Sequence, residues 1–145
     1  MTVRDVLAKR DRDPITCRPE DTVQSAATLM SSNRIGAMPV QDGEGRVVGM
    51  ISERDIVRAF STHSARLIDL LVSDLMTREV ITCTSDSPIR EAMQTMSTKR
   101  IRHLPVFENG KFVGVVSIGD TLANMLESLK MEANVLRDIA ISRAG

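Results

Sequence analysis

The chain has 145 residues, no net charge, 42% hydrophobic residues and 26% charged residues, a composition typical of a soluble globular protein. The neutral charge and the 2% aromatic content argue against nucleic acid or an anionic membrane as ligand. No apolar run is long enough for a bilayer, and the charged N-terminus lacks the apolar segment of a secretory signal. We therefore expect a cytoplasmic protein.

The first part of the chain predicts the order strand, helix, strand, strand, helix. Val23, Ala26, Ala27 and Met30 recur at helical spacing, which indicates the first helix. The turn "DGEG" joins the last two strands into a hairpin. In chain order the predicted strands are 15–17 "ITC", 37–40 "AMPV" and 46–52 "RVVGMIS", and the second helix begins at residue 53.

The same order is then repeated. Residues 15–40 align without a gap on residues 81–106, and residues 45–55 align on residues 110–120. Since one such unit buries little surface alone, we expect an α+β fold in which two β-α-β-β-α copies pack about a pseudo-twofold axis. We place the first repeat at 1–62, a linker at 63–71, the second repeat at 72–128 and a C-terminal helical tail at 129–145.

Both copies place the phrase Gly-x-x-Ser-x-x-Asp where a strand gives way to a helix. It reads "GMISERD" at 49–55 and "GVVSIGD" at 114–120. One interpretation is helix capping by the serine and the aspartate. The other is a ligand site, because helix N-termini attract anions and a carboxylate accepts hydrogen bonds from two ribose hydroxyls. Its repetition favours the ligand site.

Two further features each have two interpretations. The segment "KRIRHLPV" at 99–106 is either a solvated basic edge or a phosphate clamp, since Arg and protonated His suit phosphate oxygens. Cys17 and Cys83 occur in matching "ITC" phrases and belong to no CxxC pair. We interpret them as small buried thiols rather than a disulfide, a metal site or a redox sensor.

The paired phrases "RIGAMPV…GRVVGMISERD" and "RIRHLPV…GKFVGVVSIGD" resemble the CBS domain, and the tandem resembles a CBS pair, or Bateman module. The resemblance covers almost the whole chain. It implies a regulatory energy or metabolite sensor that binds an adenosine-containing ligand (AMP, ADP, ATP, NAD or S-adenosylmethionine) in two clefts between the repeats. It also implies a disc-like homodimer and no catalytic role.

The family pattern, carried over residue by residue, combines positions from both repeats in each cleft. The resemblance implies that cleft A contains Ser52, Arg54, Asp55, Thr77, Ile81, Thr82, Ile101, Arg102 and His103. It implies that cleft B contains Ser117, Asp120, Ile15, Thr16, Ile35, Gly36 and Ala37. Cleft A collects up to three cationic groups and cleft B none from these positions, so we expect cleft A to be the stronger phosphate site.

After Asp120 the sequence predicts one long helix. Its apolar residues step alternately by four and three, which is the spacing of a heptad seam: Leu122, Leu126, Leu129, Ala133, Leu136 and Ala140. The seam either packs on its own domain or, beyond about residue 130, on another subunit. Two alternatives to a nucleotide sensor remain, namely a ligand-free scaffold for protein interaction and a protein that acts through Cys17 and Cys83.

Overall fold

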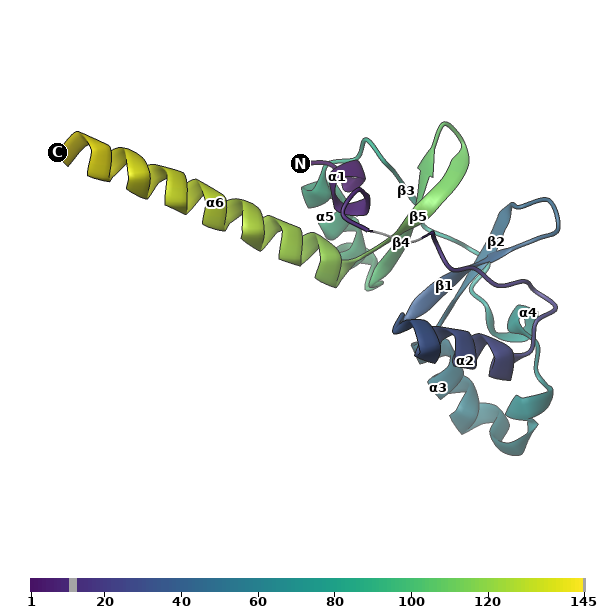
Figure 1. Cartoon of the computed structure of the whole chain (residues 1–145). Helices are drawn as coiled ribbons and strands as arrows, with labels where there is room; N and C mark the ends of the chain where they lie inside the picture. The colour runs from purple at the N-terminus through teal and green to yellow at the C-terminus, as the bar shows by residue number, and fades with distance from the viewer. Residues whose placement is uncertain (11–12, 145) are drawn as a thin grey trace.

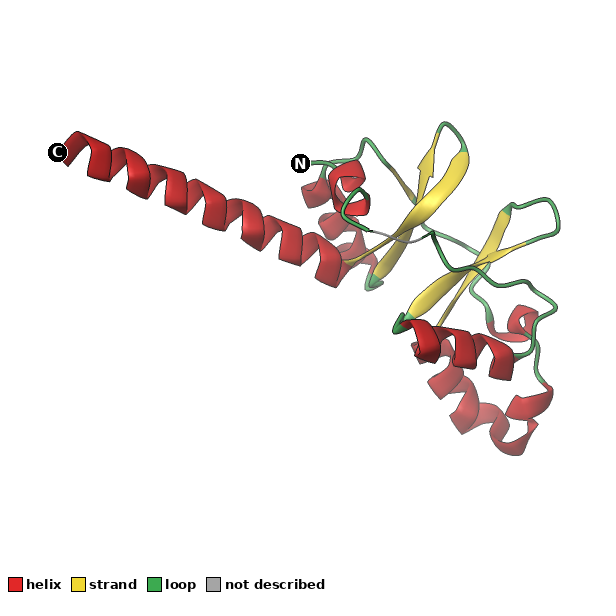
Figure 2. Cartoon of the chain, in the orientation of Figure 1, coloured by secondary structure: helices red, strands yellow, loops and turns green. Residues whose placement is uncertain are grey.

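The computed structural model describes residues 1–10 and 13–144. Figures 1 and 2 show two units of helices and strands, with one long helix projecting from the second. The first unit contains α2 (Val23–Asn33), β1 (Ala37–Gln41), β2 (Val47–Ser52) and α3 (Glu53–His63). The second unit contains β3 (Cys83–Thr84), α5 (Ile89–Lys99), β4 (His103–Glu108), β5 (Lys111–Ser117) and the start of α6 (Ile118–Ala144). A 3-10 helix, η1 (Ser64–Asp69), follows α3, and the short helices α1 (Val3–Leu7) and α4 (Val72–Leu75) precede the two units.

The two hairpins have matching register, which confirms the predicted repeat. Ala37 pairs with Ser52 in the first, and His103 pairs with Ser117 in the second. The predicted strand at 15–17 is only a bridge, in which Cys17 lies parallel to Val40, whereas its counterpart forms the two-residue strand β3 beside β4. The prediction was too long because only Cys17 bonds to β1, through Pro39 and Gln41.

Each unit has its own apolar core, and each core includes the helix that precedes the other unit. Val3 and Val6 of α1 are buried with Ile89 and Leu104 of the second unit. Val72 and Met76, in and just after α4, are buried with residues of the first unit, such as Met38 and Ile51. Because burying one such side chain contributes about 1.5–3 kcal/mol, these exchanged segments hold the two repeats together.

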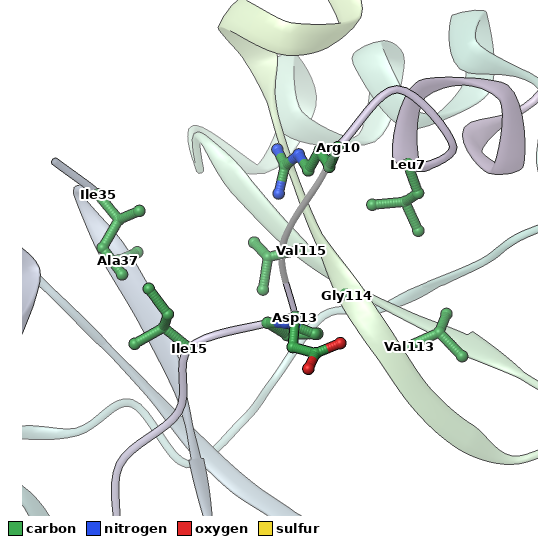
Figure 3. A pocket seen from close by; sticks show the side chains of 10 residues that line it. Leu7, Arg10, Asp13, Ile15, Ile35, Ala37, Val113, Gly114 and Val115 are labelled. Carbon is green, nitrogen blue, oxygen red and sulfur yellow. The ribbon is translucent and has the colours of Figure 1, made fainter. Parts of the chain in front are cut away.

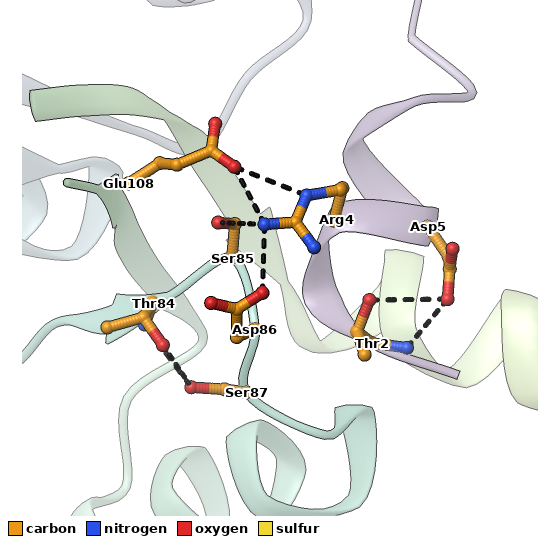
Figure 4. A network of polar contacts seen from close by, with 8 residues as sticks. All are labelled: Thr2, Arg4, Asp5, Thr84, Ser85, Asp86, Ser87 and Glu108. Atoms are coloured by element: carbon orange, nitrogen blue, oxygen red, sulfur yellow. Dashed lines mark hydrogen bonds and ion pairs between the residues drawn. The ribbon is translucent and has the colours of Figure 1, made fainter.

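A polar network fixes α1 on the second unit (Figure 4). The guanidinium of Arg4 donates to Glu108 at 2.7 Å and to Ser85 at 3.1 Å, and it lies 2.8 Å from Asp86. The hydrogen bond from Arg4 lowers the pKa of Glu108. These exposed contacts fix the position of α1, and hence of the segment that follows it, against the second repeat.

The helix α6 has 27 residues and extends well beyond the second unit, as the sequence predicts (Figure 1). Thr121 and Asn124 in its first turns are buried. Within the described ranges, no helix has the length and apolar content needed to cross a bilayer.

Candidate functional site

A cavity of about 80 Å³ lies between the two repeats (Figure 3). Its first-repeat wall consists of Ile15, Ile35 and Ala37, three residues predicted for cleft B. The opposite wall is strand β5 of the second repeat, and Arg10 and Asp13 lie between the two walls. The remaining lining residues are Leu7, Arg10, Asp13, Pro14, Val113, Gly114 and Val115. The cavity therefore shares three residues with the set predicted for cleft B, and the rest of its lining was not predicted.

Arg10 connects this cavity to the predicted carboxylate of cleft B. Its guanidinium forms an ion pair with Asp120, whose backbone N–H donates to the Ser117 hydroxyl at 3.1 Å. Cleft B therefore has a cation that the repeat alignment does not reveal. The available sequence signal was length, because seven residues (8–14) separate the opening phrase "VRDVL" from "ITC" and only four (77–80) separate its counterpart "VSDLM" from the second "ITC".

The corresponding carboxylate of cleft A makes contacts inside its own repeat. Oδ2 of Asp55 accepts from the Ser52 backbone N–H at 2.9 Å and from the Ser52 hydroxyl at 3.0 Å. The N–H of Asp55 donates back to the Ser52 hydroxyl at 3.3 Å, so the helix-capping interpretation is confirmed. Capping leaves Oδ1 of Asp55 without a hydrogen bond among the described residues. A ligand hydroxyl could therefore still donate to this carboxylate.

At each predicted cleft, the second strand of the hairpin has a glycine where the segment that opens the other repeat packs against it. A Cβ built on Gly49 would lie 2.7 Å from the Met76 sulfur, and one built on Gly114 would lie 3.0 Å from a methyl carbon of Leu7. Thr77 also pairs with Met50 through two backbone hydrogen bonds of 2.8 and 3.0 Å. Thr77 is thereby held against β2, two residues before Ser52.

The other predicted residues of cleft A differ in exposure. Ile81 and Ile101 are half-buried and pack against the second core. Thr82, Arg54 and Arg102 are exposed, and neither arginine forms an ion pair within the described part of the chain. In cleft B, Thr16 is half-buried, next to Ile15 in the cavity wall. The left-handed residues Arg34 and Arg100 end α2 and α5 and turn the chain toward these positions.

His103 lies between the repeats. A Cβ on Gly36 would be 3.5 Å from the imidazole and 3.6 Å from the Glu53 carboxylate, so the missing side chain at Gly36 leaves room for both. Burial lowers the pKa of His103; Asp120 and Glu53 oppose this shift, and Arg10 and Arg102 add to it. The imidazole is therefore mainly neutral at pH 7. In the repeat alignment His103 corresponds to Ala37, which lines the cavity of cleft B.

The cysteines are free thiols with raised pKa values. Burial raises the pKa of Cys17 to about 12 and that of Cys83 to about 11. Since the thiolate is the reactive and metal-binding form, both are unsuited to redox or metal chemistry near neutral pH. In the part of the chain that the structure describes, no three His, Cys, Asp or Glu side chains form a metal site.

The two repeats each consist of a short strand or bridge, a helix, a hairpin and a second helix. They exchange their opening helices and leave a cavity between them, which defines a tandem α+β repeat module. The family model of the CBS domain matches residues 3–62 and 72–127. The chain therefore belongs to the CBS-domain family, as a tandem pair, and the resemblance seen in the sequence is confirmed.

Solved structures of similar proteins agree. The CBS-domain containing protein ATU1752 from Agrobacterium tumefaciens is 36% identical with a TM-score of 0.83, covering 86% of this chain and 99% of that one. The CBS domain pair of MJ0100, in complex with 5′-methylthioadenosine and S-adenosyl-L-methionine, is 27% identical with a TM-score of 0.77, covering 88% and 97%. PAE2072 from Pyrobaculum aerophilum, complexed with AMP, is 26% identical with a TM-score of 0.73, covering 83% and 89%.

Proposed function

We propose that this protein is a regulatory sensor that binds an adenosine-containing ligand in the clefts between its repeats. The ligand is AMP, ADP, ATP, NAD or S-adenosylmethionine, and the signal passes in trans from a homodimer to a protein target. The observation that carries the proposal is the inter-repeat cavity. Its walls are largely apolar, and Arg10, which lines it, is ion-paired with the carboxylate of Asp120. The adenosine ligands of MJ0100 and PAE2072 support the same chemistry.

The groups of cleft B suit the three parts of a nucleotide. Ile15, Ile35 and Val115 form apolar walls for an adenine ring. Asp120 is a candidate acceptor for ribose hydroxyls, and Arg10 is a candidate donor to phosphate oxygens. Because the cavity of about 80 Å³ holds only a few waters, a nucleotide requires the Arg10 side chain, which lines it, to move outward.

Cleft A is proposed as the stronger phosphate site. Its candidate phosphate ligands are Arg54, Arg102 and His103, and the exposed arginines have no competing ion pair among the described residues. In cleft B the single cation is already paired with Asp120. A phosphate at cleft B must therefore compete with an existing ion pair, whereas one at cleft A need not.

A ligand-free scaffold for protein interaction is the second candidate. The observation that favours it is that both predicted ribose carboxylates already have protein partners, Ser52 for Asp55 and Arg10 for Asp120. In this case the clefts stay closed and the helices carry the interaction.

A thermal-shift panel with AMP, ADP, ATP, NAD and S-adenosylmethionine tests the proposal. At a ligand concentration of 100 times Kd we expect about 2.7 kcal/mol of stabilisation, or roughly 5–10 °C for a chain of this size. The control is the double variant Asp55→Ala/Asp120→Ala, which should fold and lose the response. A panel without any shift in the wild type would favour the scaffold.

A further inference from the structure

The long helix α6 exposes a continuous row of leucines. Leu126, Leu129 and Leu136 are 58%, 55% and 68% exposed. With Leu122, Ala133 and Ala140 they form the heptad seam, here called the α6 seam. Only the first turns of α6 pack on the second repeat, where Thr121 and Asn124 are buried and Met125 contacts the core. The seam is therefore left uncovered within one chain.

A single helix of this kind is not expected to remain uncovered in water. Its 27 residues span about 40 Å. Helices in proteins owe most of their stability to the packing of an apolar face against another part of the structure. An alternating four-and-three spacing matches the seam of a supercoiled helix pair rather than the broader face of a helix packed on a domain. The spacing thus indicates another helix with the same repeat as partner.

The charges beside the seam identify that helix and its direction. With Leu122, Leu129 and Leu136 at heptad position d, the other seam residues (Leu126, Ala133 and Ala140) occupy a. Lys130 and Arg137 then occupy e positions and Glu132 occupies a g position. In a parallel pair, each g residue faces the e residue five positions further along the partner, so Glu132 faces Arg137. In an antiparallel pair e faces e, which brings Lys130 and Arg137 together with like charges. Glu132 has no ion pair within the described chain.

We propose that α6 forms a parallel two-stranded coiled coil with α6 of a second copy, joined by two ion pairs between Glu132 and Arg137 of the partner subunit. This deepens the homodimer of the proposed function by assigning its interface and direction. It does not depend on ligand binding. Parallel pairing places both second repeats, and with them the predicted clefts of both copies, at the same end of the coil.

Charge reversal tests the pairing in the full chain. Glu132→Arg and Arg137→Glu should each raise the dimer dissociation constant roughly tenfold, because each reverses two symmetric ion pairs. The double variant should return it close to the wild-type value. Neither residue has an opposite charge three or four positions away in its own helix, so helix stability should not change. Sedimentation equilibrium gives the constants, and a monomeric wild type or a double variant without recovery would overturn the proposal.

Cross-linking tests the direction independently. In a Cys17→Ser/Cys83→Ser background, Arg143→Cys places a thiol at the next d position, where parallel helices bring two copies together. Oxidation should give a disulfide dimer, whereas the control Ser142→Cys, one position away on the outer face, should give little. Equal yields from the two variants would contradict parallel pairing. The nucleotide thermal shift should persist in every variant, which separates this test from that of the proposed function.

Discussion

The two predicted clefts have the same backbone arrangement and differ in their polar groups. In each, a strand glycine lies against the segment that opens the other repeat: Gly49 against Met76, and Gly114 against Leu7. The carboxylates differ in their partners, since Asp55 accepts from Ser52 and Asp120 pairs with Arg10. A duplicated unit can thus keep the same packing around its strand glycine while the polar groups beside it diverge.

The difference depends largely on one connection. The segment 8–14 is longer than its counterpart 77–80, and it carries Arg10 to the mouth of cleft B. The shorter connection instead pairs Thr77 directly with Met50. Cleft B therefore has a charged side chain where cleft A has a backbone bridge.

The largest expected effect is on ligand binding by the two carboxylate variants. Asp55→Ala should weaken AMP binding by roughly 10- to 100-fold, because a hydrogen bond to a charged group contributes about 1.5–3 kcal/mol. Asp120→Ala should cost less, since its carboxylate is already neutralised by Arg10. Isothermal titration of AMP into each variant measures both losses.

Arg10→Gln is the matched control for this comparison. It frees Asp120 without removing it, so it should change binding at cleft B and leave the loss caused by Asp55→Ala as it was. Equal losses from Asp55→Ala and Asp120→Ala would refute the proposed asymmetry.

The two glycines allow a comparison of packing, with a smaller effect. Gly49→Ala should lower the free energy of unfolding by about 2 kcal/mol, because its Cβ would meet the Met76 sulfur at 2.7 Å and the Thr77 carbonyl oxygen at 3.0 Å. Gly114→Ala should cost about 1 kcal/mol or less, since the three atoms nearest to its Cβ belong to the flexible side chain of Leu7. Urea unfolding gives both values, and a larger cost at Gly114 would contradict the described packing.

The sequence predicted the local elements, including the repeated hairpins and the long helix α6, and it missed contacts between segments far apart in the chain. The matched phrases predicted the paired hairpins, because alternating and helical spacing are local properties. The contact of Arg10 with Asp120 joins residues far apart in the chain, and Arg10 lies in a segment without an equal counterpart, so no alignment of the repeats could find it. The exchange of α1 and α4 was missed for a related reason, since an apolar segment does not specify which core it enters. The remaining site residues stay predictions.

The smallest expected effect concerns His103, which distinguishes the clefts because Ala37 stands at its position in the first repeat. Burial places the pKa of His103 below its unfolded value of 6.5, so the unfolded chain binds the proton more tightly. The contribution of His103 to stability is therefore full above that value and falls as the pH drops through it. The free energy of unfolding, measured from pH 8 to pH 5.5, should fall less in His103→Ala than in the wild type.

The same measurement with AMP tests whether His103 belongs to the ligand site. A phosphate beside the imidazole would favour its protonated form, so AMP should reduce the loss of unfolding free energy at low pH in the wild type but not in the variant. Identical pH profiles for the two proteins, with and without AMP, would place His103 outside the ligand site.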